Sequence, residues 1–146
     1  MNNPGIYSLG DAVIGAPVTD QVITSATSAQ GTVQALVDRL DGMTALSLQV
    51  RFAYGAGGTA LKVDIETSLD QGQTWVLIAR LAFATVSATK VVNLSGLTPM
   101  TTPASPGPLA DDACLDGVLG DRLRAKVSST GTYSNNTSIS VRAAVR

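Results

Sequence analysis

The sequence predicts an all-β protein: a single antiparallel β-sandwich, jelly-roll-like, with an extended N-terminal arm and one long proline-rich loop. Three observations support this class. Several runs alternate apolar and polar side chains with the period of two that is typical of a half-buried strand. Only 14% of the residues are charged and 4% aromatic, and Ser, Thr and β-branched residues are frequent, which suits sheets better than helices. No run has the apolar spacing of a long amphipathic helix.

The chain of 146 residues is expected to form one domain with its own core. Residues 1–17 contain prolines and glycines with only short apolar pieces, so we expect an extended arm there, followed by the sandwich domain over residues 18–146. The apolar side chains of the arm are Ile6, Tyr7 and Leu9, which are candidate contacts with a neighbouring molecule. A disordered terminus is the alternative.

The first expected strands differ in the strength of their pattern. Residues 21–27 favour a strand, and residues 32–40 fit either a strand or a short helix. Residues 45–54 and 60–67 alternate strictly between apolar and polar side chains. Because only the glycine-rich turn 55–58 separates them, we expect these two runs to pair as an antiparallel hairpin.

The later strands follow the same reasoning. Residues 74–84 are apolar at both parities, which predicts a central strand covered on both sides or a strand at an oligomer interface. Residues 122–127 and 138–145 alternate again, and the loop 128–137 between them contains the Gly and Asn that turns favour. In total we expect about seven or eight strands at roughly even spacing, as in a sandwich or a jelly roll.

Residues 96–120 interrupt the strand pattern. They contain several acidic residues and four of the six prolines, which are Pro99, Pro103, Pro106 and Pro108. A loop of this length inside a domain is uncommon and tends to be functional or mobile. It is therefore either a flexible surface excursion or a partner-binding loop, and in the second case the four prolines are candidate contacts.

Ser68, Asp70, Gly72, Thr74 and Trp75 have the S-x-D-x-G-x-T-W spacing of the Asp-box, a turn that recurs on the blades of sialidases. The chain has one copy and no repeat of propeller period, and it is too short for six blades. The motif is therefore expected to be a structural turn rather than a sugar site. Asp70 would accept backbone hydrogen bonds, Gly72 would take a positive φ, and Trp75 would cover the turn or enter the core.

Catalytic and metal-binding chemistry finds little support in this sequence. The chain has no histidine, which excludes His-based triads and His metal sites. Cys114, the single cysteine, has no His partner and cannot form an internal disulfide. Asp111, Asp112 and Asp116 lack the spacing of an EF-hand, so a solvated loop is favoured over a Ca²⁺ site. We expect no enzymatic activity, no metal and no cofactor.

The charge balance gives no reason to expect a nucleic-acid or membrane partner, because the formal net charge is -1. The first residues lack the basic and apolar regions of a signal peptide, and no apolar run is long enough to span a membrane. We therefore expect a protein made in a cytoplasm. Arg122, Arg124 and Lys126 share one strand face, which is either solvated or in contact with an acidic partner surface.

Two segments resemble small structural proteins of tailed bacteriophages. They are "SLDQGQTWVLIARLAF" at residues 68–83 and "DGVLGDRLRAKVSSTGTYSNNTSISVRA" at residues 116–143, and the likeness extends over residues 18–146. The chain is similar to jelly-roll capsid cement, or decoration, proteins. The proline-rich stretch 99–108 has no counterpart in that pattern.

The resemblance implies a non-enzymatic virion protein that is assembled in the host cytoplasm. It would be a homo-oligomer, a dimer or a trimer, bound to the capsid exterior, where it stabilises the lattice of the phage major capsid protein. No catalytic residues are implied. Two alternatives stay open: a carbohydrate-recognition module of a phage head or tail that uses Trp75, Tyr7, Tyr54 or Tyr133, and a head–tail connector or tail component present in few copies.

Overall fold

The computed structural model describes residues 4–23 and 42–146, so the expected element at 32–40 lies outside the described residues. The described part contains strands and no helix, and the predicted all-β class is confirmed. The strands are β1 (Gly5–Val13), β2 (Gln21–Val22), β3 (Ala45–Ala53), β4 (Ala56–Gly57), β5 (Ala60–Ser68), β6 (Val76–Phe83), β7 (Ala88–Ser95), β8 (Arg122–Thr130), β9 (Tyr133–Ser134) and β10 (Ser138–Val145).

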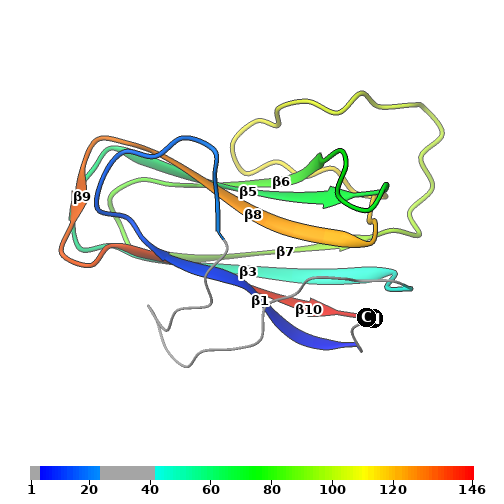
Figure 1. Ribbon diagram of the computed structural model, residues 1–146, viewed down its shortest axis with the longest axis horizontal. Coiled ribbons are helices and arrows are strands. Elements are labelled where there is room, and N and C mark those ends of the chain that lie inside the picture. Colours follow the sequence, from blue (N-terminus) through cyan, green and yellow to red (C-terminus); the bar gives the residue numbers. More distant parts are fainter. Residues whose placement is uncertain (1–3, 24–41) are drawn as a thin grey trace.

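Two four-stranded antiparallel sheets form two layers (Figure 1). The first sheet has the order β1-β10-β3-β7, the second has the order β2-β8-β5-β6, and β4 and β9 form a small third sheet. The pairs are nested in the sequence: β1 with β10, β2 with β8, β3 with β7 and β5 with β6. The chain therefore runs like one long hairpin whose successive pairs alternate between the two sheets.

The hydrophobic core lies between the inward faces of the two sheets. Leu46, Leu48, Val50 and Phe52 of β3 are all buried, while the residues between them are exposed. β5, β8 and β10 contribute the other large part of this core, which consists of Leu61, Val63, Ile65, Leu123, Ala125, Val127, Ile139, Val141, Ala143 and Val145. The alternation in the sequence thus identifies the inward face of each of these strands correctly.

The expected hairpin between residues 45–54 and 60–67 is wrong. β3 and β5 lie in different sheets, since β3 pairs with β10 and β7 while β5 pairs with β6 and β8. Gly55 and Gly57 carry the chain from one layer to the other, and a Cβ at either position would lie under 2.5 Å from a backbone oxygen of the β8–β10 segment. Two half-apolar strands can bury their faces against each other across a core as well as edge to edge, and here they face each other.

The expected central position of residues 74–84 is also wrong, because β6 is the last strand of its sheet. A bulge places both Ile78 and Ala79 inside, which explains part of the apolar character at both parities. The outer edge of β6 is covered by the loop after β7: Arg80 donates its backbone N–H to Ala113, and Leu115 donates its own to Ile78. The loop supplies the cover that the sequence pattern suggested would come from a neighbouring strand.

Most of the expected N-terminal arm is a strand. Residues 5–13 form β1, which pairs with β10 along its whole length around a bulge between Ser8 and Gly10. Arg142 of β10 donates hydrogen bonds to Ser8 Oγ at 2.9 Å and to Asp11 Oδ1 at 2.7 Å. Because the polar residues of β1 find buried partners, the strand lacks the apolar pattern by which strands are recognised.

A strand that the sequence pattern did not indicate, β7, completes the first sheet. The apolar–polar alternation of β7 is hard to recognise, because the polar Lys90 is at a position that faces the other sheet and the apolar Val91 is at one that faces solvent. Val91 is 72% exposed. Lys90 reaches the rim between the sheets, where its ammonium group binds Asp112 and the carbonyl of Ala82.

An aromatic cluster closes one end of the core. Ring centroids are between 5.2 and 6.1 Å apart for four pairs: Phe52–Tyr54, Phe52–Phe83, Phe52–Tyr133 and Tyr54–Tyr133. Tyr133 is 1% exposed and donates its hydroxyl to the carbonyl of Ala84 at 2.7 Å. This ring is therefore a core residue, and it is closed off from any ligand.

Gly58 lies directly against the Tyr133 ring, and we expect that no side chain can be accommodated at this position. Its φ is +70°, and an added Cβ would lie 2.3 Å from the ring of Tyr133. We predict that Gly58→Ala lowers the free energy of unfolding by about 2 kcal/mol or more, because left-handed strain adds to displacement of the ring. Urea denaturation measures this loss. Gly15→Ala, with nothing within 4 Å and an ordinary φ, is the control, and equal midpoints for the two variants would contradict the prediction.

Candidate functional site

The Asp-box residues form a compact turn between β5 and β6. Ser68 Oγ accepts the backbone N–H of Gly72 at 2.7 Å and donates to Asp70 Oδ1 at 2.9 Å. Asp70 also accepts the backbone N–H of Thr74 at 2.8 Å and its hydroxyl at 2.6 Å. Gly72 has a φ of 93°, the left-handed region that favours glycine. The carboxylate of Asp70 is therefore used within the turn.

Trp75 lies over this turn and does not enter the core. It is partly exposed, and its ring lies 3.8 Å from where a Cβ of Gly72 would be. The guanidinium group of Arg124, on β8, lies 4.0 Å from the ring centroid, so the cation covers one face of the indole. The ring thereby joins the turn to the outer face of the second sheet.

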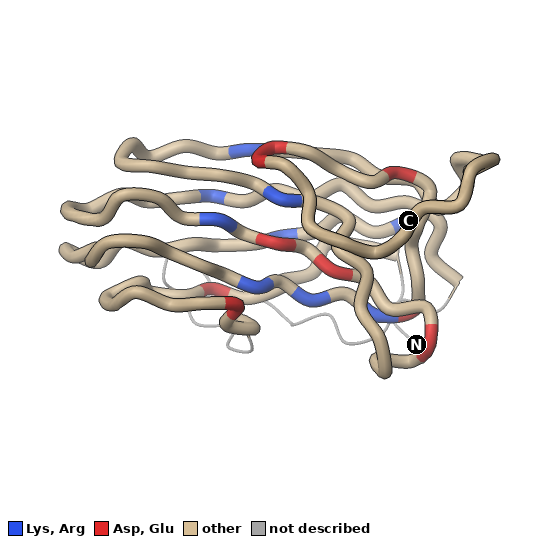
Figure 2. Tube along the Cα trace, turned by 90° about the horizontal axis from the view of Figure 1, so that it is seen from above, with Lys and Arg blue, Asp and Glu red and all other residues tan. Residues whose placement is uncertain are grey.

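That outer face carries alternating charged rows, which Figure 2 shows as neighbouring blue and red bands. Asp64 and Glu66 of β5 lie between Arg80 of β6 and the basic row of β8. Arg80 Nε is 2.7 Å from Asp64, and Arg124 Nε is 2.7 Å from Glu66. Lys126 Nζ is 3.4 Å from Glu66. The bond to Asp64 raises the pKa of Arg80 above its usual value.

The basic row of β8 forms ion pairs with acidic residues of the same chain. Arg124 and Lys126 are paired with Glu66, and Arg122 is 3.1 Å from Asp121. Because each cation of the row already has an acidic neighbour within the chain, the face offers no block of free positive charge to an acidic partner. The exposed part of these pairs contributes little to stability.

A shallow polar groove of about 270 Å³ lies beside these ion pairs. The segment Pro106–Pro108 and Trp75 both line it. The groove is lined by Asp20, Asp64, Glu66, Trp75, Leu77, Arg80, Pro106, Gly107, Pro108 and Lys126. Both acidic and basic groups point into it, so it suits a neutral, hydroxyl-rich ligand better than a strongly charged one.

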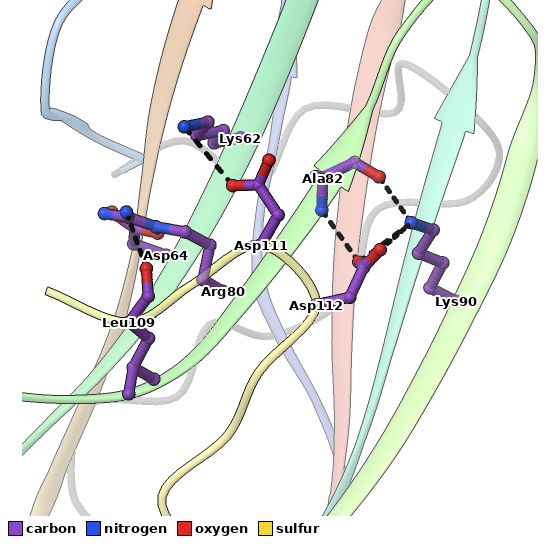
Figure 3. Close-up of polar contacts among 8 residues, drawn as sticks. All are labelled: Lys62, Asp64, Arg80, Ala82, Lys90, Leu109, Asp111 and Asp112. Carbon is purple, nitrogen blue, oxygen red and sulfur yellow. Dashed lines mark hydrogen bonds and ion pairs between the residues drawn. The ribbon is translucent and has the colours of Figure 1, made fainter.

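The loop between β7 and β8 is fastened to β5, β6 and β7 (Figure 3). Arg80 Nη1 donates to the carbonyl of Leu109 at 2.9 Å, and Lys62 lies 3.2 Å from Asp111. Asp112 accepts the ammonium group of Lys90 at 2.8 Å and the backbone N–H of Ala82 at 3.1 Å. The second half of the loop is therefore held to three strands, β5, β6 and β7, and is no free excursion.

Asp116 fastens the loop at its start. It accepts the backbone N–H of Ser95 at 2.7 Å and the hydroxyl of Thr98 at 3.0 Å. These bonds lower the pKa of Asp116, as the bond from Lys90 lowers that of Asp112. The three acids of the loop thus bind different partners and do not converge. Within residues 4–23 and 42–146, no group of three metal-ligating side chains is found.

Residues 97–108 project from this fastened base (Figure 1), and every one of them is exposed. The segment contains no charged residue, and it presents Leu97 at 71% and Met100 at 42% exposure. It includes the four candidate proline contacts Pro99, Pro103, Pro106 and Pro108.

The candidate contacts of the expected arm are divided. Ile6 is 71% exposed on β1, Tyr7 packs against the core, and Leu9 is buried at 3% exposure. Leu9 therefore belongs to the hydrophobic core of this chain. The sequence pattern did not single out Leu97 and Met100, the two large apolar residues on either side of Pro99.

Comparison of the chain with models of known families, with curated proteins and with solved structures finds no match in any of the three. In the described part of the chain, no helix is long and apolar enough to cross a membrane.

The bonds of Asp70 predict how the turn responds to pH. Because Thr74 lowers the pKa of Asp70, this carboxylate stabilises the fold above the ordinary carboxyl pKa of about 4. The contribution disappears as the pH falls from there through the lower folded pKa. We predict that Asp70→Asn has a lower melting temperature than the wild type at pH 7. The difference in melting temperature should become smaller by about pH 2.5, where Asp70 of the wild type begins to be protonated in the folded state. Thermal unfolding at both pH values measures it. Gln73 is a neutral residue of the same turn, so Gln73→Ala should lower the melting temperature less, and by the same amount at both pH values. A difference in melting temperature between Asp70→Asn and the wild type that stays the same at both pH values would contradict this account.

Proposed function

We propose that this protein is a non-enzymatic structural protein of a phage virion that binds the outside of the capsid and stabilises the lattice of the major capsid protein. The chain would act as a homo-oligomer on the assembled shell. The proposal rests on the segment resemblance at residues 68–83 and 116–143 and on one structural observation, the projecting loop 97–108.

We also propose the finer fold assignment, a β-sandwich of jelly-roll topology. The nested pairs β1·β10, β2·β8, β3·β7 and β5·β6, divided between two sheets, support it. Such a double-sheet arrangement occurs in viral capsid proteins and in lectins. Since one fold hosts many functions, the topology raises the expectation of a virion or lectin role but does not choose between them.

The loop 97–108 carries the capsid-binding proposal. Four prolines restrict its backbone, and Asp116 and Arg80 fasten the segment on either side of it. A segment restricted in this way loses less conformational entropy on binding than a free loop. Leu97 and Met100 would supply the buried apolar area, with the prolines around them. On a symmetric lattice, many such modest contacts add up through avidity.

We predict that Leu97→Ser/Met100→Ser weakens binding to purified capsids of the encoding phage about tenfold or more, because apolar contact area is lost. Co-sedimentation with the capsids measures this affinity. The control is Leu69→Ser/Val86→Ser, which removes two other exposed apolar residues, both outside the loop.

Equal binding by both double variants would contradict the role of the loop. Capsids that bind the protein yet rupture at the same temperature would contradict a stabilising role. Hundreds of copies per virion support decoration of the shell, and a dozen copies at one vertex would favour the connector or tail alternative.

The carbohydrate-recognition alternative is favoured by the groove beside Trp75. One face of the ring is covered by Arg124, and Tyr133, another aromatic candidate, is buried in the core. If the groove binds neutral glycans, binding on a glycan array should be lost in Trp75→Ala and kept in Leu69→Ala, an exposed residue of the same turn. Absence of any glycan binding by the wild-type protein would rule this function out.

A further inference from the structure

The sheet edges of the described chain are protected very unequally. An exposed edge strand offers unpaired N–H and C=O groups to any other strand, and proteins normally block such edges. The edge of β6 is covered by the loop through Ala113 and Leu115, β2 has only two residues, and β1 contains the bulge at Ser8–Gly10. β7 has eight residues in unbroken register with β3, without bulge or proline, and its other side has no partner strand.

The hydrogen bonds at the end of β7 show which backbone groups point outward. Gly96 donates its N–H to Thr44, on the β3 side, whereas Ser95 binds Asp116 and Gly117 on the opposite side. Backbone groups alternate in direction along an antiparallel strand. Thr89, Val91 and Asn93 therefore direct their N–H and C=O groups away from β3. Within the described part of the chain, no hydrogen bond reaches these groups.

The side chains on this edge do not obstruct the approach of another strand. Thr89, Val91 and Asn93 are exposed and uncharged, and Val91 is 72% exposed. Lys90 is the one charged residue of β7, and edge lysines often prevent pairing. Here its ammonium group is turned toward Asp112 and the carbonyl of Ala82. The lysine that would otherwise block pairing at this edge is therefore bound to groups of its own chain.

We propose that the free edge of β7 binds β7 of a second copy of this chain, antiparallel, with Val91 at the two-fold axis. In this register Val91 lies opposite Val91 of the second copy, and Thr89 lies opposite its Asn93. The three outward residues of each strand then pair with one another, and the two first sheets join into one. The edge is self-complementary, as an isologous dimer requires, because each Thr89 meets an Asn93 across the two-fold axis at Val91 and no like charges are brought together. This inference does not depend on the proposed virion role.

The first test is the oligomeric state of the wild-type protein and of Val91→Pro, measured by analytical ultracentrifugation. Because the N–H of Val91 points away from β3, proline removes no bond within the monomer and suits an edge strand. We expect a wild-type dimer and a dissociation constant raised about thirtyfold or more in Val91→Pro, since both copies lose a donor at the axis. Val91→Thr keeps the N–H and the branched shape and should dimerise like the wild type.

A second test locates the contact directly. In a Cys114→Ser background, Val91→Cys should form a disulfide-linked dimer on mild oxidation, because Cα atoms opposite each other in such a pair are about 5.5 Å apart. Val86→Cys, at 73% exposure but before the strand, should remain uncross-linked.

Three outcomes would overturn the proposal. The first is a wild-type protein that stays monomeric at about 100 µM, a concentration well above the dissociation constants of stable dimers. The second is a folded Val91→Pro variant that dimerises as strongly as the wild type. The third is equal cross-linking of the Val86→Cys and Val91→Cys variants. A monomer in which Val91→Pro abolishes capsid binding would instead assign the edge to a strand of the capsid protein.

Discussion

Burial of a single apolar layer between two sheets is the constraint on which this structure depends. Strands β3, β5, β8 and β10 each have one apolar face, which a single sheet cannot cover. The two sheets therefore face each other, and Phe52 of the first sheet meets Phe83 of the second at 5.2 Å between ring centroids. Strands β3 and β5 lie in different sheets and contribute to this layer from opposite sides, although only a short glycine-rich turn lies between them.

Arg80 connects this core architecture to the surface that we consider functional. Its backbone N–H holds the loop edge at Ala113, while its guanidinium group binds Asp64 within the sheet and Leu109 in the loop. Together with Asp112 and Asp116, it converts a long connection into a fastened segment with one projecting part. An uncharged, proline-rich projection on a rigid base suits a protein that acts by contact.

The projecting loop and the free edge of β7 could serve one purpose at two levels. The edge would join two copies, and each copy would then present its own loop to a larger surface. Doubling the number of weak contacts in this way raises the overall affinity without any new type of contact. Because the two features involve different residues, Val91 in one and Leu97 with Met100 in the other, they can be tested separately.

The sequence by itself determined the strand class, the inward residues of β3, β5, β8 and β10, and the Asp-box residues expected to form a turn. These properties are local, since they follow from period-two alternation and from side chains bonding to their own backbone. It indicated a long loop but not what fastens it, because the partners of Asp112 and Asp116 are remote in the sequence. Which strands pair, why β1 and β7 are strands at all, and which edge stays open were decided only by the tertiary structure. The physical reason is that Lys90, Asp11 and Arg142 break the local pattern and are accommodated by partners on other strands.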